Sequence, residues 1–169
     1  MPRVSGFTVI ELMFVVALVA VLLTIGAPAL HTMIINNRIS TAAGDLISDF
    51  TFARATAIGR AQRVSICASN DQATCNGASW GQGWIVFTDA NADGDFDAGT
   101  DNIVRVREAL APGLTVTPTP NALGIQFRPS GPADAARRFQ VCKPGFVGRN
   151  VDLNATGRAI STATPAACT

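Results

Sequence analysis

The pattern of hydrophobic and polar positions divides the chain into an unbroken apolar start, a periodic stretch and a series of short runs. Residues 7–30 are almost entirely apolar, and Glu11 is the only charged side chain among these 24 residues. About 20 apolar residues suffice to cross a bilayer as an α-helix. The first segment therefore predicts a membrane-spanning helix.

Apolar residues then recur in steps of three and four, as on one face of an α-helix. The residues of this face are Ile35, Ile39, Ala42, Leu46, Phe50, Ala53 and Ala57. We therefore predict one helix from Phe7 to about Ala61, whose amphipathic second half, residues 31–61, covers a sheet. Gly26 and Pro28 predict a bend or local melting, because proline removes one helical hydrogen bond.

Short β-branched or aromatic runs separated by Gly, Pro, Asn and Asp occupy residues 62–169. They are RVSICAS, GWIVFTD, NIVRVRE, LTVTP, LGIQFRP, RFQVCK and RNVDLN. The alternation of valine and arginine over residues 104–107 predicts a strand with one solvent-facing side. One long N-terminal helix followed only by strands indicates the α+β class. The length after the apolar segment fits a single domain with its own core.

The net charge and the sequence motifs add little to this prediction of the fold. The formal net charge is +1, which does not favour a protein that coats nucleic acid. The only histidine is His31, just past the apolar run, and the chain has neither a GxSxG elbow nor a phosphate-binding glycine loop. We therefore expect a protein that is not an enzyme.

The four cysteines are Cys67, Cys75, Cys142 and Cys168. They lack the CxxC spacing of a zinc site, and one histidine cannot complete such a site. In an oxidising compartment an even number indicates disulfides, with three possible connectivities. We favour Cys67–Cys75, which closes a short loop, and Cys142–Cys168, which ties the C-terminus to a strand. Buried free thiols are the alternative.

Glu11 needs an explanation, because an ionisable side chain at membrane depth costs a few kcal/mol. A secretory signal peptide fits poorly, since this run is too long and has an acid near its front. Cleavage between Gly6 and Phe7 would instead create a positive amino group near Glu11. The sequence GFTVIEL closely resembles the type III signal of type IV pilins and pseudopilins.

This resemblance implies a leader peptide, residues 1–6, that a prepilin peptidase/N-methyltransferase removes after Gly6 before it methylates Phe7. Glu11 would then guide the subunit into a growing filament, with residues 7–30 as its transmembrane and filament-core segment. The protein would wait in the bacterial inner membrane as a single-pass protein, in contact with lipid and with an assembly platform. Residues 62–169 would form a β-rich domain in the periplasm. Type IV pilins often carry a disulfide that holds the C-terminal region, which supports Cys142–Cys168.

Three further stretches, ARATAIGRAQRVSI, WGQGWIVFTDANADGD and TGRAIS, resemble the GspH/FimT branch of the pilin superfamily. The implied fold is a long N-terminal helix packed on an antiparallel β-sheet domain. The implied function is that of a minor pilin or pseudopilin, a structural subunit of a type IV pilus or a type II secretion pseudopilus. Such a subunit would lie at or near the filament tip, aid its assembly with other pilin subunits, and serve secretion or pilus biogenesis.

The segment DANADGDFDAGTD matches the first half of a calcium-binding EF-hand loop. The candidate ligands are Asp89, Asn91, Asp93 and Asp95. The pattern then fails, because Thr100 occupies the twelfth position, where a glutamate should close the site. We favour a hairpin turn, since Asp, Asn and Gly favour turns. Calcium is the alternative, and no other cofactor is expected.

Some FimT-like minor pilins bind DNA during natural transformation through a Gly-Arg-x-Arg motif. TGRAIS supplies Arg158 and VGRNVD supplies Arg149, but each lacks the second arginine. Arg137 and Arg138 add two further cations nearby in the sequence. Arginines can hold phosphates through paired hydrogen bonds. A solvated strand face is our favoured interpretation, and DNA binding is the alternative function.

Overall fold

The computed structural model describes residues 7–168, and residues 25, 26 and 28 are described by their backbone alone. Helix α1 extends over 52 residues, Val9–Arg60, which confirms the single helix predicted from the apolar periodicity. Its backbone stays helical through residues 25–28, so the helix does not melt there. The bend expected at Gly26 and Pro28 stays a prediction. The leader, residues 1–6, lies outside the described residues.

The chain divides into two compact units, residues 1–35 and 36–169. In the first unit the large apolar side chains described among residues 7–30 are exposed, from 45% at Val15 to 78% at Phe7. An 18-residue window here has a mean hydropathy of 2.7, and α1 is long and apolar enough to cross a membrane. Exposed apolar surface of this extent marks a segment that meets lipid or other proteins.

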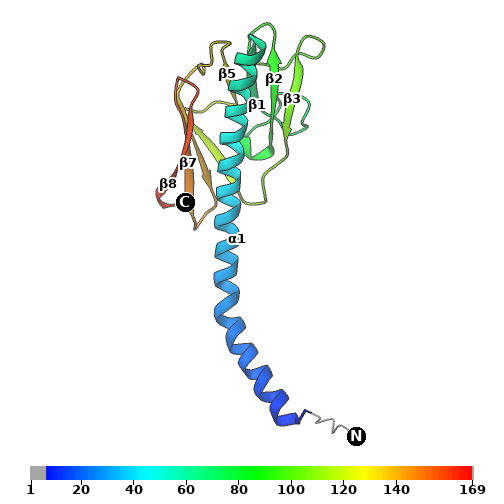
Figure 1. Ribbon diagram of the computed structural model, residues 1–169, viewed down its shortest axis with the longest axis vertical. Helices are drawn as coiled ribbons and strands as arrows, with labels where there is room; N and C mark the ends of the chain where they lie inside the picture. Colours follow the sequence, from blue (N-terminus) through cyan, green and yellow to red (C-terminus); the bar gives the residue numbers. More distant parts are fainter. Residues whose placement is uncertain (1–6, 169) are drawn as a thin grey trace. The chain divides into compact units, whose positions relative to one another are not determined.

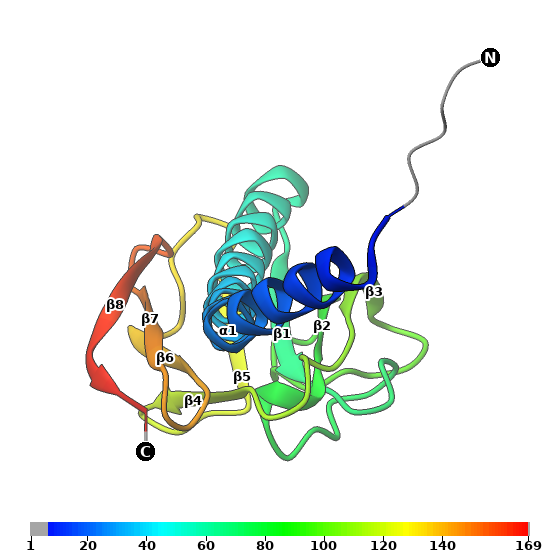
Figure 2. The same ribbon diagram turned by 90° about the horizontal axis from the view of Figure 1, so that it is seen from below.

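The second unit contains two four-stranded antiparallel sheets, whose strands are labelled in part in Figure 1 and in full in Figure 2. The first has the order β3-β2-β1-β5. Its strands are β1 (Arg63–Ala68), β2 (Trp84–Asp89), β3 (Asn102–Arg107) and β5 (Gly124–Phe127). The second has the order β4-β6-β7-β8. Its strands are β4 (Thr115–Thr119), β6 (Arg137–Cys142), β7 (Val147–Leu153) and β8 (Ala159–Ala167). A short 3-10 helix, η1 (Trp80–Gln82), precedes β2. The seven predicted strands are present, and the α+β fold with a helix on antiparallel sheets is confirmed.

The eighth strand, β8, was not predicted from the sequence. Its sequence AISTATPAA is rich in small residues and contains Pro165, and Ile160 is its only large residue of the β-branched or aromatic kind that typically marks a strand. β8 forms the edge of its sheet and pairs only with β7, from Leu153 opposite Ala159 to Val147 opposite Ala167.

The core lies where the second part of α1 packs on both sheets. Figure 2 shows this part of α1 with β6, β7 and β8 to one side and β1, β2 and β3 to the other. Leu46, Phe50, Ala53 and Ala57 are each 0% exposed, which confirms the predicted apolar face. The Phe50 ring lies 5.0 Å from the Phe139 ring of β6, measured between centroids. Aromatic pairs at such distances contribute about 1 kcal/mol beyond their buried area.

Both predicted disulfides are present. Cys67 is bonded to Cys75 over 8 residues, and Cys142 to Cys168 over 26 residues. Gly148 of β7 passes beside the second bridge: a Cβ at this position would lie 2.7 Å from the Cys168 Sγ and 2.5 Å from the Val141 carbonyl oxygen. Only glycine fits there without a shift of the bridge or the backbone.

The loop closed by Cys67–Cys75 is organised around Asp71. Its carboxylate accepts hydrogen bonds from the Thr74 hydroxyl at 2.7 Å and from the backbone N–H groups of Ala73 and Thr74, both at 2.9 Å. These bonds, that from the Thr74 hydroxyl foremost, hold the pKa of Asp71 well below its ordinary value of 3.8. Hydrogen bonding to the ionised form lowers a carboxyl pKa in this way.

We expect acid to loosen this loop. Because the pKa of Asp71 is lower in the folded than in the unfolded chain, its stabilisation is present above pH 3.8 and is lost as the pH falls toward the folded pKa. The amide NMR shifts of Ala73 and Thr74 should therefore titrate with a midpoint below 3.8. Asp71→Ala should abolish this titration. A midpoint at or above the ordinary value in the wild type would contradict the assignment.

Candidate functional site

Glu11, which the sequence assigned to assembly, lies in the first turn of α1, and Phe7 precedes the helix. Gly6, on one side of the predicted cleavage site, lies outside the described residues, and Phe7 is exposed. The Thr8 hydroxyl accepts a hydrogen bond from the backbone N–H of Glu11 at 3.4 Å, and the Thr8 carbonyl accepts one from Leu12 at 3.2 Å. Thr8 therefore caps the helix, and Glu11 occupies the third helical position.

This arrangement adds a local role for Glu11 that the sequence analysis missed. Threonine followed three residues later by glutamate is the sequence of a capping box, so TVIE itself was the available signal. A carboxylate in the first turn also interacts favourably with the partial positive charge of the helix N-terminus. The side chain of Glu11 is exposed.

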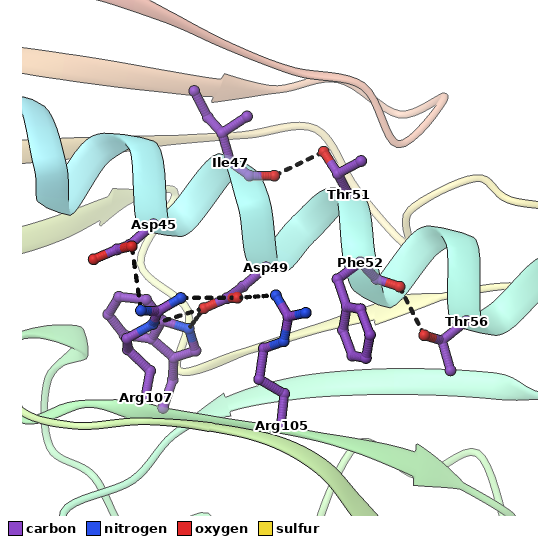
Figure 3. A network of polar contacts seen from close by, with 9 residues as sticks. Asp45, Ile47, Asp49, Thr51, Phe52, Thr56, Arg105 and Arg107 are labelled. Carbon is purple, nitrogen blue, oxygen red and sulfur yellow. Dashed lines mark hydrogen bonds and ion pairs between the residues drawn. The ribbon is translucent and has the colours of Figure 1, made fainter.

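A buried ionic cluster joins α1 to β3, and Figure 3 shows it at close range. Asp49 is 0% exposed. Its carboxylate accepts hydrogen bonds from Trp84 Nε1 at 2.9 Å, Arg105 Nη1 at 2.8 Å, and Arg107 Nε and Nη2 at 3.1 and 3.2 Å. Asp45, one turn earlier, forms an ion pair with Arg107 at 3.2 Å. The hydrogen bonds that Arg107 donates to Asp49 raise the pKa of the Arg107 guanidinium.

The sequence predicted that β3 has one solvent-facing side, and the cluster shows that this is not the side of the arginines. Arg105 and Arg107 face α1 instead, and the Arg105 guanidinium lies 3.7 Å from the centroid of the Phe52 ring. Val106, on the opposite side of the strand, is 43% exposed. Asp49 compensates the arginine charges, which allows a charged strand face to pack against a helix.

The acidic segment after β2 is a turn between β2 and β3, as predicted from its Asp, Asn and Gly residues. The Asp89 carboxylate, 2% exposed, accepts hydrogen bonds from the N–H groups of Ala92 at 2.6 Å and Gly94 at 3.0 Å. Asp101 likewise accepts bonds from the N–H groups of Ala90 and Asp97, both at 3.0 Å. Both carboxylates thus stabilise the turn.

The calcium ligands proposed from the sequence are only partly available. Asp89 is buried and hydrogen-bonded within the turn, whereas Asn91, Asp93 and Asp95 are exposed. Within residues 7–168, no group of three or more His, Cys, Asp or Glu side chains is arranged to hold a metal ion. Calcium binding stays a prediction that this geometry does not support.

The four arginines of the DNA hypothesis do not form one cluster. Arg137 is paired with Asp134 at 2.7 Å, and Arg138 with Asp152 at 2.6 Å. Arg149 lies opposite Ala163, whereas the residue after Arg158 lies opposite Leu153. Five residues of strand, about 17 Å, therefore separate Arg149 from Arg158 along the sheet. DNA binding stays a prediction.

The glycines of these Gly-Arg pairs have structural reasons of their own. Gly148 makes room for the Cys142–Cys168 bridge. Gly157 has a φ of +80°, and a Cβ there would lie 2.5 Å from the Gly131 carbonyl oxygen. The Arg54 side chain packs beside Gly157 and donates a hydrogen bond to the Gly131 carbonyl at 3.1 Å. These contacts account for both glycines without a nucleic acid.

Comparisons with known proteins agree with the fold. Residues 42–157 match the family described as type II transport protein GspH, and residues 1–27 match the prokaryotic N-terminal methylation motif. No curated protein sequence matches the chain. The type IV minor pilin FimU of Pseudomonas aeruginosa superposes with a TM-score of 0.62 and 23% identity, over 78% of this chain and 96% of FimU. In a second crystal form of FimU the values are 0.59 and 22%, over 75% and 98%.

The minor pseudopilin EpsH of the Vibrio cholerae type 2 secretion system superposes with a TM-score of 0.53 and 13% identity, over 76% of this chain and 99% of EpsH. At these identities the solved structures establish a shared fold. The GspH match covers more than half of the chain and includes the end of α1 and most of the β-domain. This chain therefore belongs to the GspH family and has a pilin-like fold.

Proposed function

We propose that this chain is a minor pilin or pseudopilin, anchored in the bacterial inner membrane by residues 7–30, with its β-rich domain in the periplasm. A prepilin peptidase/N-methyltransferase removes residues 1–6 and methylates Phe7. The subunit then leaves the membrane through an assembly platform and joins other subunits at or near the tip of a type IV pilus or a type II secretion pseudopilus. There it aids assembly of the filament.

The observation that carries this proposal is the continuity of α1. One helix begins with an exposed, membrane-length apolar segment and continues into the core of the β-domain. An exposed apolar segment needs lipid before assembly and neighbouring helices after it. The methylation motif over residues 1–27 lies at the start of the same segment. Pilin-family membership implies assembly with other pilin or pseudopilin subunits.

Mass spectrometry of the mature protein tests the processing step. We expect a chain that begins with N-methylated Phe7, and we expect Gly6→Val to block cleavage, because the peptidase must approach the backbone closely. A mature chain that retains residues 1–6, or one that begins after Leu30, would contradict the proposal.

Substitutions at Glu11 test its role in assembly. Glu11→Gln keeps a side chain that can complete the capping box but removes the charge that would neutralise the Phe7 amine. We expect Glu11→Gln to lower incorporation into filaments roughly tenfold or more, since an uncompensated charge at membrane depth costs a few kcal/mol. Incorporation is measured by immunoblotting of sheared filaments.

Thr8→Ala is the matched control for that substitution. It removes the cap hydroxyl, at a cost of about 1 kcal/mol of helix stability, but leaves the carboxylate. Incorporation close to wild type is therefore expected. If Thr8→Ala lowers incorporation as much as Glu11→Gln, the glutamate acts only by stabilising the helix start, and its assignment to assembly is wrong.

A further inference from the structure

A groove within the second unit lies between α1 and the segment that follows β3. We call it the α1–β3 groove; residues 37–45 of α1 form one wall, and residues 106–114 form the other. Its volume is about 530 Å³, within the range of about 300–1,000 Å³ typical of ligand pockets. Ala42 and Leu114, 3% and 9% exposed, provide apolar surface at its base.

The two walls each carry a charged side chain without an ion-pair partner among residues 7–168. Asp45 and Arg107, which also line the groove, are paired with each other. Arg38 on the helical wall and Glu108 on the opposite wall are exposed and form no such pair within that range. The groove therefore presents one cation and one anion from opposite sides, above apolar surface.

The groove belongs to the part of the chain that follows the membrane-length segment directly. Arg38 comes eight residues after Leu30. Helix α1 is continuous from Leu30 to Arg38, and eight helical residues rise about 12 Å. The headgroup layers bring a bilayer of about 30 Å of hydrocarbon to about 40–45 Å. When residues 7–30 span the hydrocarbon, Arg38 is thus within reach of the lipid headgroups.

We propose that the α1–β3 groove binds the headgroup of a phospholipid that carries a primary amine, of the phosphatidylethanolamine class. Arg38 faces the phosphate, because a guanidinium donates paired hydrogen bonds to phosphate oxygens. Glu108 accepts hydrogen bonds from the ammonium, and Ala42 and Leu114 contact the methylene carbons. A choline headgroup has no N–H donor for Glu108, so the groove discriminates between the two lipids.

This inference rests on the proposed membrane anchoring, and it assigns the subunit a lipid-bound state that precedes its assembly into the filament. Headgroup binding holds the β-domain at the membrane surface until the subunit is taken up by the filament, where no headgroup accompanies it. The bound lipid stabilises the folded domain by mass action, as does any ligand that binds only the native state.

The experiment uses the full chain in bilayer discs of phosphatidylcholine alone or mixed equally with phosphatidylethanolamine. Trp80 and Trp84 are buried in the β-domain, so their fluorescence reports its thermal unfolding. We expect the unfolding midpoint to be about 4 °C higher in the mixed discs. Arg38→Gln and Glu108→Gln should each abolish this difference without lowering the midpoint in phosphatidylcholine, because both side chains are exposed. Arg128→Gln, an exposed arginine outside the groove, should retain the difference.

Equal midpoints of the wild type in the two lipids would overturn the inference, and so would a difference that persists in both groove variants. Flotation of the chain with vesicles separates this failure from a failure of anchoring: a chain that does not float rejects both proposals. A chain that floats but shows no dependence on the amine lipid rejects only the groove. If Arg38→Gln lowers filament incorporation while the lipid effect is unchanged, the groove binds a neighbouring subunit instead.

Discussion

Replacement of Asp49 with alanine should lower the free energy of unfolding of the β-domain by about 3 kcal/mol. Removal of one partner from a buried ion pair costs about 3–5 kcal/mol, because the remaining charge is left uncompensated. The lower end applies here, since the Arg105 and Arg107 side chains are 33% and 30% exposed and can partly reach water. The Trp84 N–H, however, loses its acceptor in the core. Urea denaturation followed by tryptophan fluorescence measures the change.

Two further variants separate charge from hydrogen bonding in this cluster. Asp49→Asn retains an oxygen that can accept a hydrogen bond from Trp84 but removes the charge that compensates the two arginines. We therefore expect its loss in free energy of unfolding to lie between those of Asp49→Ala and Asp45→Ala. Asp45→Ala is the matched control one turn earlier. Its carboxylate is 30% exposed and has one ion pair, and such pairs contribute about 0–1 kcal/mol. Equal losses for Asp45→Ala and Asp49→Ala would show that burial of Asp49 contributes nothing.

The cluster also shows what periodicity in a sequence can and cannot predict. Leu46, Phe50 and Ala53 recur at helical spacing because one face of α1 is buried, and this regularity is local. Asp49 is next to Phe50 in sequence and equally buried, but its burial depends on Arg105, 56 residues later. A charged residue beside an apolar stripe is usually solvated. Two aspartates at i,i+4 and two arginines at i,i+2 were the only signal of such a pairing.

Strand β8 was not predicted from the sequence, for a different physical reason. Its residues form a strand because β7 offers a pairing edge and because Cys142–Cys168 fixes its end, not because of their intrinsic preference. Hydrogen bonds between Cys168 and the Gly145–Phe146 turn fix the same end. Tertiary context commonly determines the structure of small and polar residues in this way. By contrast, Trp84–Asp89 contains large apolar side chains, all of its residues are buried, and it was predicted from composition alone.

The sequence near the N-terminus carries a functional signal and a structural signal in the same residues. GFTVIEL identified the pilin-like signal, and the match to the methylation motif agrees with it. The same residues include the Thr8–Glu11 cap, which the capping-box pattern alone predicts. Glu11 can serve both purposes, because capping involves the helix start within one subunit, whereas its assembly role would be exerted on an amine after cleavage.

Loss of the Cys142–Cys168 bridge should destabilise the β-domain by an amount similar to that expected for Asp49→Ala. Loop-closure entropy for a separation of 26 residues predicts a stabilisation of about 3.5 kcal/mol. The double variant Cys142→Ser/Cys168→Ser should lose this amount and should also release β8, which pairs with β7 alone and has an open edge. Denaturation measures the first effect. Faster proteolysis within residues 159–168, at a denaturant concentration where the fold persists, measures the second.

The matched control is Cys67→Ser/Cys75→Ser, which opens a loop of only 8 residues. The same entropy argument gives about 2.5 kcal/mol for this loop. Because this bridge joins β1 to the loop around Asp71, its loss should leave proteolysis of β8 unchanged. The two double variants are compared at denaturant concentrations that give them the same free energy of unfolding. If global destabilisation alone exposes β8, its cleavage should then be accelerated equally in both. Selective cleavage in Cys142→Ser/Cys168→Ser under that condition establishes that the bridge fixes the edge strand. Equal cleavage would mean that pairing with β7 is sufficient to hold it.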